Sequence, residues 1–242
     1  VASDQHVGAP TPELSFPREQ KFVAWLDEVK KDAEAIFLLG DLFDFWFEYK
    51  TVVPKGFVRI LGKLAEIRDS GIPIYFFVGN HDLWMSDYFE KELNIPVYHD
   101  NQEYTFNEKT FLIGHGDGKG PGDKGYKRMK KVFTNPFSKW LYRWLHPDIG
   151  VKLAQHLSVK NKLISGAEDV KFLGDENEWL ILYAKRKLET RHYNYFVFGH
   201  RHLPMIKSVG ENSQYVNLGD WINYFTYGVF DGETFEVKKF EK

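Results

Sequence analysis

The sequence predicts an α/β protein in which two β-sheets pack together and a helical segment is inserted between two strands of the core. Three observations support this prediction. Short continuous apolar runs alternate with segments whose apolar residues recur at helical spacing, which is the pattern of βαβ units. The C-terminal part reads as strands joined by tight turns. Residues 118–188 read as helices without a buried strand.

Strands and helices alternate through the first half of the chain. Ala35 to Leu39 and Ile72 to Val78 are continuous apolar runs, as expected for strands of a parallel sheet that is covered on both faces. Gly71 is expected to end the helix before the second run. The expected strands cover residues 1–3, 35–39, 72–78, 97–98, 104–106 and 110–113, and the expected helices cover residues 18–31, 57–67 and 87–93.

The second half is expected to hold the inserted helices and the last strands. The helices cover residues 126–133, 137–145, 150–159 and 176–188, and the strands cover residues 195–198, 214–218, 226–230 and 234–240. Turns at Gly219-Asp220 and Asp231-Gly232 lead us to expect antiparallel pairing of the last three strands. The predicted division is a core of residues 1–117 and 189–242 with a helical cap of residues 118–188.

Composition excludes several classes of protein. The chain has no cysteine, so disulfide bonds, cysteine-ligated zinc and thiol catalysis are excluded. It has no run of 18 or more apolar residues, so we expect no membrane-spanning helix, and we expect no signal peptide. A chain of 242 residues that is 43% hydrophobic can form one large domain with an insertion.

Charge is distributed unevenly along the chain. The formal net charge is −2, yet residues 118–162 hold eleven Lys and Arg against two Asp, a local balance of +9. Such a basic segment is typical of a surface that faces an anionic partner. A solvated helix face without a partner is the alternative interpretation.

Polar motifs follow five of the expected strands, where each strand ends. They are Ser3-Asp4-Gln5-His6, Gly40-Asp41-Leu42-Phe43-Asp44, Gly79-Asn80-His81-Asp82, Gly114-His115-Gly116-Asp117 and Gly199-His200-Arg201-His202. Ligands of α/β sheets bind beyond the carboxyl ends of the strands, so we expect these motifs to meet. The glycines permit the close backbone turns that such a site requires. Taken singly, each motif could be a helix cap, a turn or surface histidines.

Together the motifs offer a set of metal ligands without thiolate, which suits Mn²⁺, Fe²⁺ or Zn²⁺. The candidate ligands are Asp4, His6, Asp41, Asn80, His115, His200 and His202. Seven ligands are too many for one ion that also binds water, but they suit two ions that share a carboxylate, for which Asp41 is the natural choice. Two-metal sites hold their ions about 3.5–4 Å apart and serve in-line displacement at phosphorus.

The ordered motifs resemble those of the calcineurin-like metallophosphoesterase superfamily, across residues 1–117 and 195–220. The resemblance implies a four-layered αββα sandwich and two metal ions. It assigns the first ion to Asp4, His6, Asp41 and His202, and the second to Asp41, Asn80, His115 and His200. It further implies that a hydroxide bridging the ions is the nucleophile. His81 would stabilise the transferred phosphoryl group or protonate the leaving oxygen, oriented by Asp44.

The cap is expected to select the substrate. Phe45 stands where Ser/Thr protein phosphatases of the superfamily carry Arg, which argues against that class. The cap also contains a group of aromatic residues among its basic ones, namely Tyr126, Phe133, Trp140, Tyr142 and Trp144. Such aromatics can stack nucleic-acid bases, contact a lipid surface or simply pack on the core.

A closer resemblance narrows this choice. Gly-Asp-Leu-Phe-Asp-Phe-Trp at residues 40–46 and His115-Gly116-Asp117 followed by Gly122-Asp123-Lys124-Gly125-Tyr126 resemble the UDP-2,3-diacylglucosamine pyrophosphohydrolase family of lipid A biosynthesis, in its Bacteroidetes-type form. This implies hydrolysis at the α-phosphorus to UMP and 2,3-diacylglucosamine 1-phosphate, with two Mn²⁺ ions. It implies a cytoplasmic protein attached peripherally to the anionic cytoplasmic face of the inner membrane. Neither a nucleic-acid partner nor an obligate protein partner is expected.

The resemblance also suggests substrate-binding residues. They are Asn80, His81, Asp123 and Tyr126, to which we add three basic residues of the cap, Lys160, Lys162 and Lys171. Enterobacterial members carry Arg at the position of His81, so phosphate recognition is expected to differ here. Two alternatives stay open at this point: a phosphodiesterase or nuclease with another nucleotide or nucleic-acid substrate, and a non-enzymatic scaffold that binds anionic membrane.

Overall fold

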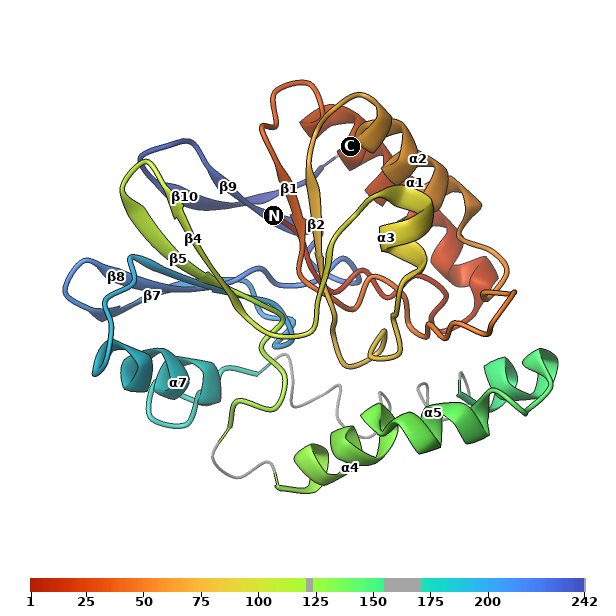
Figure 1. The fold of residues 1–242 in the computed structure, drawn as a ribbon. Coiled ribbons are helices and arrows are strands. Elements are labelled where there is room, and N and C mark those ends of the chain that lie inside the picture. Colours follow the sequence, from red (N-terminus) through yellow and green to blue (C-terminus); the bar gives the residue numbers. More distant parts are fainter. Residues whose placement is uncertain (121–123, 155–170, 242) are drawn as a thin grey trace.

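A computed structural model gives the structure of the chain and describes residues 1–120, 124–154 and 171–241. The fold is an α/β sandwich, as predicted (Figure 1). Its first sheet is parallel and contains β1 (Ile36–Leu38), β2 (Ile74–Phe77) and β3 (Val97–Tyr98) in that order. Ala2 extends this sheet by an isolated parallel bridge to Leu38.

The second sheet has five strands in the order β4-β5-β6-β8-β7. These are β4 (Gln102–Phe106), β5 (Lys109–Ile113), β6 (Tyr195–Phe198), β7 (Met205–Gly210) and β8 (Ser213–Asn217). The three central strands are parallel, and the two edge strands are antiparallel to their neighbours. A hairpin of β9 (Thr226–Phe230) and β10 (Phe235–Lys239) lies beside Val1, whose amino group and carbonyl both bond to Gly228.

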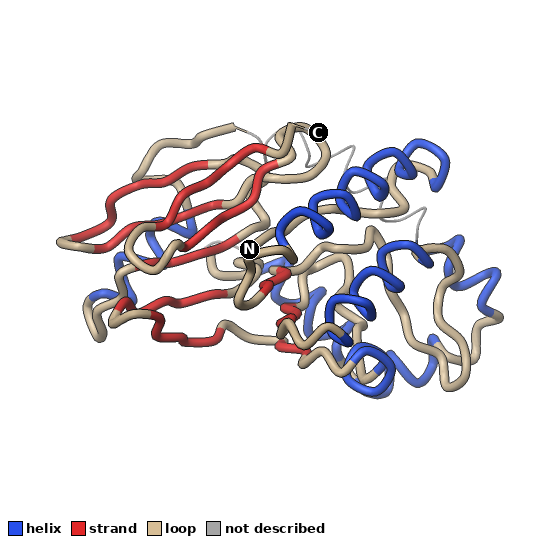
Figure 2. Tube along the Cα trace, turned by 90° about the horizontal axis from the view of Figure 1, so that it is seen from above, coloured by secondary structure: helices blue, strands red, loops and turns tan. Residues whose placement is uncertain are grey.

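Helices cover the outer faces of the two sheets. The first sheet carries α1 (Pro12–Val29), α2 (Val58–Asp69) and α3 (Tyr88–Leu93), and the second carries α7 (Trp179–Leu188) (Figure 1). Helices α4 (Lys124–Thr134) and α5 (Pro136–Tyr142) run along the lower side of the molecule in that view. Figure 2 shows from above how the strands gather on one side and most helices on the other. No helix among the described residues is long and apolar enough to cross a bilayer.

Alternation of side chains along the buried strands produces the four layers. In β1, Ile36 and Leu38 pack with the helices of the first layer, whereas Phe37 faces the second sheet. In β6, Tyr195 and Val197 join that same inter-sheet cluster, and Phe196 packs under α7 instead. Because successive strand residues point to opposite faces, each sheet buries both faces and the layers stack α-β-β-α.

Two expectations about local structure are wrong. Helix α1 begins at Pro12 and not at residue 18, because Thr11 caps it by accepting the Leu14 N–H (3.3 Å) and proline is favoured at the first helical position. Strand β7 was not expected, and β8 pairs with β7 and β6 and not with β9. Local patterns reveal a strand but not its partner, which is chosen by long-range packing.

The predicted cap contains helices of two kinds. Helix α7 buries Leu180, Ile181 and Ala184 against the second sheet, so it forms the outer layer of the sandwich. Helices α4 and α5 and the helical stretch at residues 147–154 leave many apolar side chains exposed. The rest of the helix expected at residues 150–159 lies outside the described residues. The division into core and cap stays a prediction.

Glu48 connects the loops that follow β1 and β2. Its buried carboxylate accepts the Trp46 Nε1–H (3.0 Å) and the backbone N–H groups of Ser86 (2.8 Å), Asp87 (2.9 Å) and Tyr88 (3.2 Å). The last three are the otherwise unsatisfied donors at the start of α3, where a negative charge is also favoured by the helix dipole. The carboxylate therefore fixes the distance between two loops that both carry predicted site residues.

We predict that Glu48→Ala lowers the free energy of unfolding by about 2–3 kcal/mol, because one buried indole N–H and three partly buried backbone N–H groups lose their acceptor. Chemical denaturation followed by circular dichroism measures this change. Glu66→Ala is the control, since Glu66 is an exposed member of a lysine ion cluster. Equal denaturation midpoints for the two variants would contradict the connecting role of Glu48.

Candidate metal centre

The predicted ligands lie together at the carboxyl ends of the strands. Asp41 follows β1, Asn80 follows β2, His115 follows β5, and His200 and His202 follow β6. Asp4 and His6 join them because their backbone runs beside the loop after β1, with the Asp4 N–H bonded to the Gly40 carbonyl (3.1 Å) and the His6 N–H to the Asp41 carbonyl (2.8 Å). Parallel strands in both facing sheets bring these ends to one place.

Glycine is required where the loops approach most closely. A Cβ at Gly79 would lie 2.2 Å from the Asp41 Oδ1 atom, and one at Gly199 would lie 2.4 Å from the Asp4 Oδ2 atom. Contacts this short are impossible without displacing the carboxylates. The glycines before Asn80 and His200 therefore allow the centre to be compact.

Asp4, His6 and His202 form one group of potential ligands. His202 Nε2 lies 3.4 Å from Asp4 Oδ1 and 3.4 Å from His6 Nε2, and His6 Nε2 lies 3.9 Å from Asp4 Oδ1. The Asp4 Oδ1 atom is buried and accepts no hydrogen bond. Atoms bound to one cation at about 2.0–2.2 Å lie about 3–3.5 Å apart, so this group fits a divalent ion.

Asp41, Asn80 and His115 form a second group. His115 Nε2 lies 3.1 Å from Asn80 Oδ1 and 3.5 Å from Asp41 Oδ2, and the His200 ring lies 5.1 Å from the His115 ring. Asp41 Oδ2 is also 3.7 Å from His6 Nε2, so Asp41 lies between the two groups. Within the described residues, clusters of His and Asp ligand atoms that lie within 4.8 Å of one another are Asp4/His6/His202, His6/Asp41/His81 and Asp4/Asp41/His115.

Most of these residues have an unusual backbone conformation. Five of the seven predicted ligands adopt the left-handed region, with φ values of 58° at Asp4, 46° at His6, 54° at Asp41, 68° at His200 and 50° at His202. Non-glycine residues in sparsely populated regions cost about 1–3 kcal/mol each and concentrate at functional sites. Such strain persists only where neighbouring contacts impose it.

Hydrogen bonds to the backbone hold this strained arrangement. Asp4 Oδ2 accepts the N–H of His200 (2.9 Å), and Asp41 Oδ1 accepts the N–H of His81 (2.8 Å). Arg18 of α1 donates to the carbonyl of His6 (2.6 Å). Each carboxylate thus uses one oxygen to fix a loop and turns the other toward the ligand group.

The imidazole rings are oriented by partners on the side away from the centre. His115 Nδ1 lies 2.7 Å from the Leu39 carbonyl, which only accepts, so Nδ1 carries a proton and Nε2 is the nitrogen that faces Asp41 and Asn80. His202 Nδ1 lies 3.2 Å from Asp220 Oδ2. A carbonyl or carboxylate behind a histidine is the usual outer partner in metal sites.

Asp220 and Asp82 were not singled out by sequence reasoning. The sequence indicates a turn at Asp220, and its Oδ1 does accept the N–H groups of residues 222–224 (2.8–3.1 Å).

Buried Asp82 accepts the N–H groups of Gly79 (2.6 Å) and Leu42 (3.0 Å), which ties the loops after β1 and β2 together. Burial, with the charge of Asp41, raises the pKa of Asp82 to about 7. The sequence could have revealed the role of Asp82, because this residue is the fourth member of the Gly-Asn-His-Asp motif.

Opposite charges compensate each other inside the centre. Burial alone would lower the pKa of His115, but the carboxylates of Asp41, Asp4 and Asp117 together outweigh it and raise that pKa to about 10. Burial would likewise raise the pKa of Asp41, yet His115 and His81 hold it well below its usual range. Burial lowers the pKa of His200 to about 3, so its ring is neutral at pH 7 and able to bind a metal.

His81 and Asp44 lie at the edge of the ligand group. His81 Nδ1 lies 3.0 Å from the Asp44 carbonyl oxygen and 3.4 Å from Asp44 Oδ1. The same carboxylate oxygen is 3.5 Å from His6 Nδ1. The His81 side chain is 15% exposed, so it borders both the centre and solvent.

The structure describes only some of the substrate-binding residues that were predicted in the cap. Asp123, Lys160 and Lys162 lie outside the described residues. Tyr126 donates its hydroxyl to Asp117 Oδ2 (2.6 Å), as does the Lys130 ammonium group (2.6 Å), so α4 is bonded to the loop that carries His115. The Lys171 side chain is exposed, and its carbonyl accepts a hydrogen bond from Arg201 (2.8 Å).

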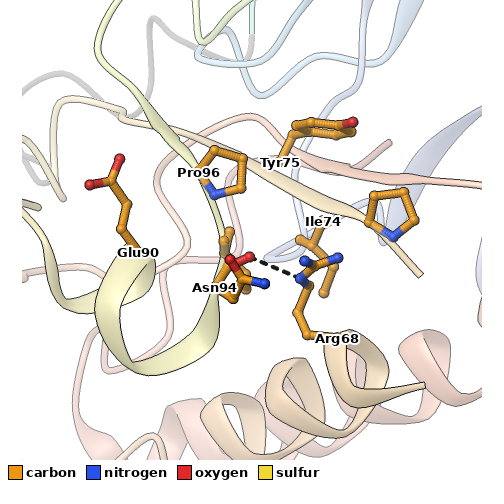
Figure 3. A pocket seen from close by; sticks show the side chains of 8 residues that line it. Arg68, Ile74, Tyr75, Glu90, Asn94 and Pro96 are labelled. Atoms are coloured by element: carbon orange, nitrogen blue, oxygen red, sulfur yellow. Dashed lines mark hydrogen bonds between the residues drawn. The ribbon is translucent and has the colours of Figure 1, made fainter. Parts of the chain in front are cut away.

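A separate hollow lies near the starts of β2 and β3, beside α2 and α3. It has a volume of about 390 Å³ and is lined by residues that include Arg68, Tyr75 and Asn94 (Figure 3). Arg68 donates from Nε to the Asn94 carbonyl (3.0 Å) among these lining residues. None of the predicted site residues lines it, so it is distinct from the metal centre.

Comparisons with known proteins agree with this geometry. Residues 1–204 match the family model of the calcineurin-like phosphoesterases. The UDP-2,3-diacylglucosamine hydrolase of Porphyromonas gingivalis is 39% identical over 99% of this chain and 96% of its own. The enzyme of that name from Edwardsiella ictaluri is 26% identical over 84% of this chain and 75% of its own.

Solved structures give weaker similarity. The phosphoesterase Yfce from E. coli has a TM-score of 0.48 and 16% identity, over 99% of this chain and 91% of its own. A dimetal phosphatase from Danio rerio has a TM-score of 0.41 and 12% identity, over 92% of this chain and 87% of its own. The family match, the near-full-length relative and the converging histidines and carboxylates lead to one conclusion: this chain belongs to the calcineurin-like phosphoesterase family and is a metal-dependent hydrolase.

Proposed function

We propose that this protein hydrolyses UDP-2,3-diacylglucosamine to UMP and 2,3-diacylglucosamine 1-phosphate by attack at the α-phosphorus. The observation that carries the proposal is the 39% identity to a UDP-2,3-diacylglucosamine hydrolase over nearly the whole of both chains. The geometry supports it, because a nitrogen and oxygen ligand set with a shared carboxylate suits phosphoester chemistry.

The proposed metal assignment follows the two ligand groups. One ion would be held by Asp4, His6, Asp41 and His202, and the other by Asp41, Asn80, His115 and His200. Two Mn²⁺ ions, when bound, lower the pKa of water and neutralise charge that develops on the phosphoryl oxygens. The protein supplies fixed ligand orientations, since hydrogen bonds to the backbone hold the Asp4 and Asp41 carboxylates and outer partners orient the His115 and His202 rings.

His81 is the proposed catalytic group that acts on the phosphoryl group or on the leaving oxygen. Its Nδ1 faces Asp44, and its side chain borders solvent at the edge of the ligand group. Asp44 orients the ring. Asn80 and His81 together would contact the phosphate, and Tyr126 and Asp123 the sugar and lipid part.

The cap is proposed to hold the acyl chains and to contact a membrane. Helices α4 and α5 and the turn that follows α5 expose a group of large apolar side chains, namely Met129, Val132, Phe133, Phe137, Trp140, Leu141 and Trp144. Exposed Lys131 and Arg143 lie among them. An apolar face bordered by basic residues is typical of segments that lie at an anionic membrane surface. Lys160, Lys162 and Lys171 remain proposed contacts of the pyrophosphate.

We expect the full chain to release UMP from UDP-2,3-diacylglucosamine with Mn²⁺ and to lose this activity after chelation. Chromatography of the released nucleotide measures it, and added Mn²⁺ should restore it. Absence of UMP release by the metal-loaded protein would overturn the proposed substrate. Faster hydrolysis of bis-p-nitrophenyl phosphate or single-stranded DNA would favour a phosphodiesterase or nuclease.

His81→Ala is expected to lower kcat by about 10²- to 10⁴-fold, the usual contribution of a positioned acid–base group. Mn²⁺ binding should be retained because the proposed ligands are intact. Asp44→Asn should have a smaller effect on kcat, since the His81 ring itself stays in place. His192→Ala is the matched control, because His192 is exposed and belongs to the loop before β6. An unchanged kcat in His81→Ala would contradict the assignment.

Phe137→Ser combined with Trp144→Ser should weaken binding to anionic vesicles at least about tenfold, because each large apolar side chain removed from water contributes about 1.5–3 kcal/mol. Vesicle co-sedimentation at low and high salt measures this, and salt should weaken wild-type binding as well. Leu14→Ser removes a side chain from α1 that is as exposed as Phe137 (67% each) and serves as control. Equal binding by all three proteins would exclude the cap as the contact.

A further inference from the structure

Arg201 occupies the position between His200 and His202 and is almost completely buried, at 8% exposure. Its guanidinium group donates from Nε to Glu178 Oε2 (3.0 Å) and from NH2 to Glu178 Oε1 (3.0 Å). Glu178 is fully buried and precedes the first residue of α7. The pair is therefore bidentate, the geometry in which an arginine is held most firmly by a carboxylate.

The same pair also binds the chain that leads into α7. Arg201 NH2 donates to the carbonyl of Lys171 (2.8 Å), and Glu178 Oε1 accepts the N–H of Leu173 (3.0 Å). Residues 171–178, which we call the return segment, are thus bonded at both ends to one ion pair. The return segment lies within the predicted cap and leads into α7, the outer layer of the sandwich.

Stability alone does not account for a buried ion pair at this position. Removing two charges from water is costly, and well-packed apolar side chains of similar volume are often as stable or more stable. A fixed guanidinium group at this position restrains the backbone on either side of Arg201, which carries His200 and His202. His200 and His202 have strained left-handed backbones, with φ values of 68° and 50°, and they approach different ligand groups.

We propose that Glu178 and Arg201 are positioning residues that hold His200 and His202 in the orientation required by both metal ions and that connect this orientation to the return segment. The anchor is the bidentate bond, because an arginine fixed at its tip restrains the backbone between the two histidines. The inference rests on the proposed dinuclear centre. It assigns no contact with substrate to either residue.

The test is Mn²⁺ binding by the full chain after metal depletion, measured by isothermal titration calorimetry, with folding checked by circular dichroism. Glu178→Gln keeps the volume of the side chain but removes its charge, which breaks the bidentate ion pair with the guanidinium group. We expect Mn²⁺ affinity to fall by about 10- to 100-fold, as is typical when an outer partner of a ligand is lost.

Asp175→Asn is the matched control. Asp175 belongs to the same return segment, but it pairs with Lys207 at 3.4 Å on the surface, with 54% and 40% of the two side chains exposed. An exposed pair contributes little, so its loss should leave Mn²⁺ affinity and stoichiometry unchanged. A comparable loss of affinity in this variant would mean that any disturbance of the segment has the same effect, and would overturn the specific role of the pair.

A second variant separates positioning from folding. Glu178→Leu combined with Arg201→Met replaces the ion pair by apolar side chains and is expected to recover the melting temperature that Glu178→Gln loses. We expect Mn²⁺ affinity to stay low in it, because the anchor is absent. Wild-type affinity and stoichiometry in a folded double variant would overturn the proposal.

Wild-type protein that binds two Mn²⁺ ions but releases no UMP would overturn the proposed substrate and leave this inference intact.

Discussion

The Asp41 carboxylate is the contact on which the arrangement of the centre depends. One of its oxygens accepts the N–H of His81, and the other lies within 3.7 Å of both His6 Nε2 and His115 Nε2. It therefore joins loops from the N-terminal segment and from both sheets. This is possible only because Gly79 lacks a side chain where the loop after β2 passes Asp41. The close approach of the two loops at Gly79 and Asp41 is therefore a condition for bringing the ligand groups together.

Strain and charge are concentrated around this contact. Five predicted ligands have left-handed backbones, and fully or nearly fully buried carboxylates face imidazoles at 3.4–3.9 Å. Such a group is unfavourable on its own, because ionised side chains are held out of water and backbones are held out of their preferred regions. Hydrogen bonds that the Leu39 carbonyl and the Asp220 carboxylate accept, and one that Arg18 donates, offset this cost from outside the group. The rigidity of the sandwich is therefore what keeps the ligand atoms close.

The helices of the predicted cap are tied to the core beside the motifs that carry the site. Trp84, three residues after His81, donates its indole N–H to the Phe133 carbonyl at the end of α4 (2.6 Å) and packs on Tyr142 of α5. Asp117, two residues after His115, binds Tyr126 and Lys130 of α4. Arg201 binds the return segment before α7. These three contacts therefore fix the position of the cap helices relative to the proposed metal ligands, and with it the position of a substrate that the helices would hold.

The sequence by itself determined the strand and helix alternation, the identity of the candidate ligands and their order, because glycine followed by Asp, Asn or His at the end of an apolar run is a local pattern. It also determined the basic, aromatic character of α4 and α5. Tertiary structure alone decided the place of β8 between β6 and β7, the packing of α7 on the second sheet, and the roles of Asp82, Asp220 and Glu178. These depend on partners far away in the chain: Glu178 meets Arg201 and Asp82 meets Leu42 only after the layers have stacked. A local pattern states which groups a residue can offer, whereas packing between distant segments decides which of them meet.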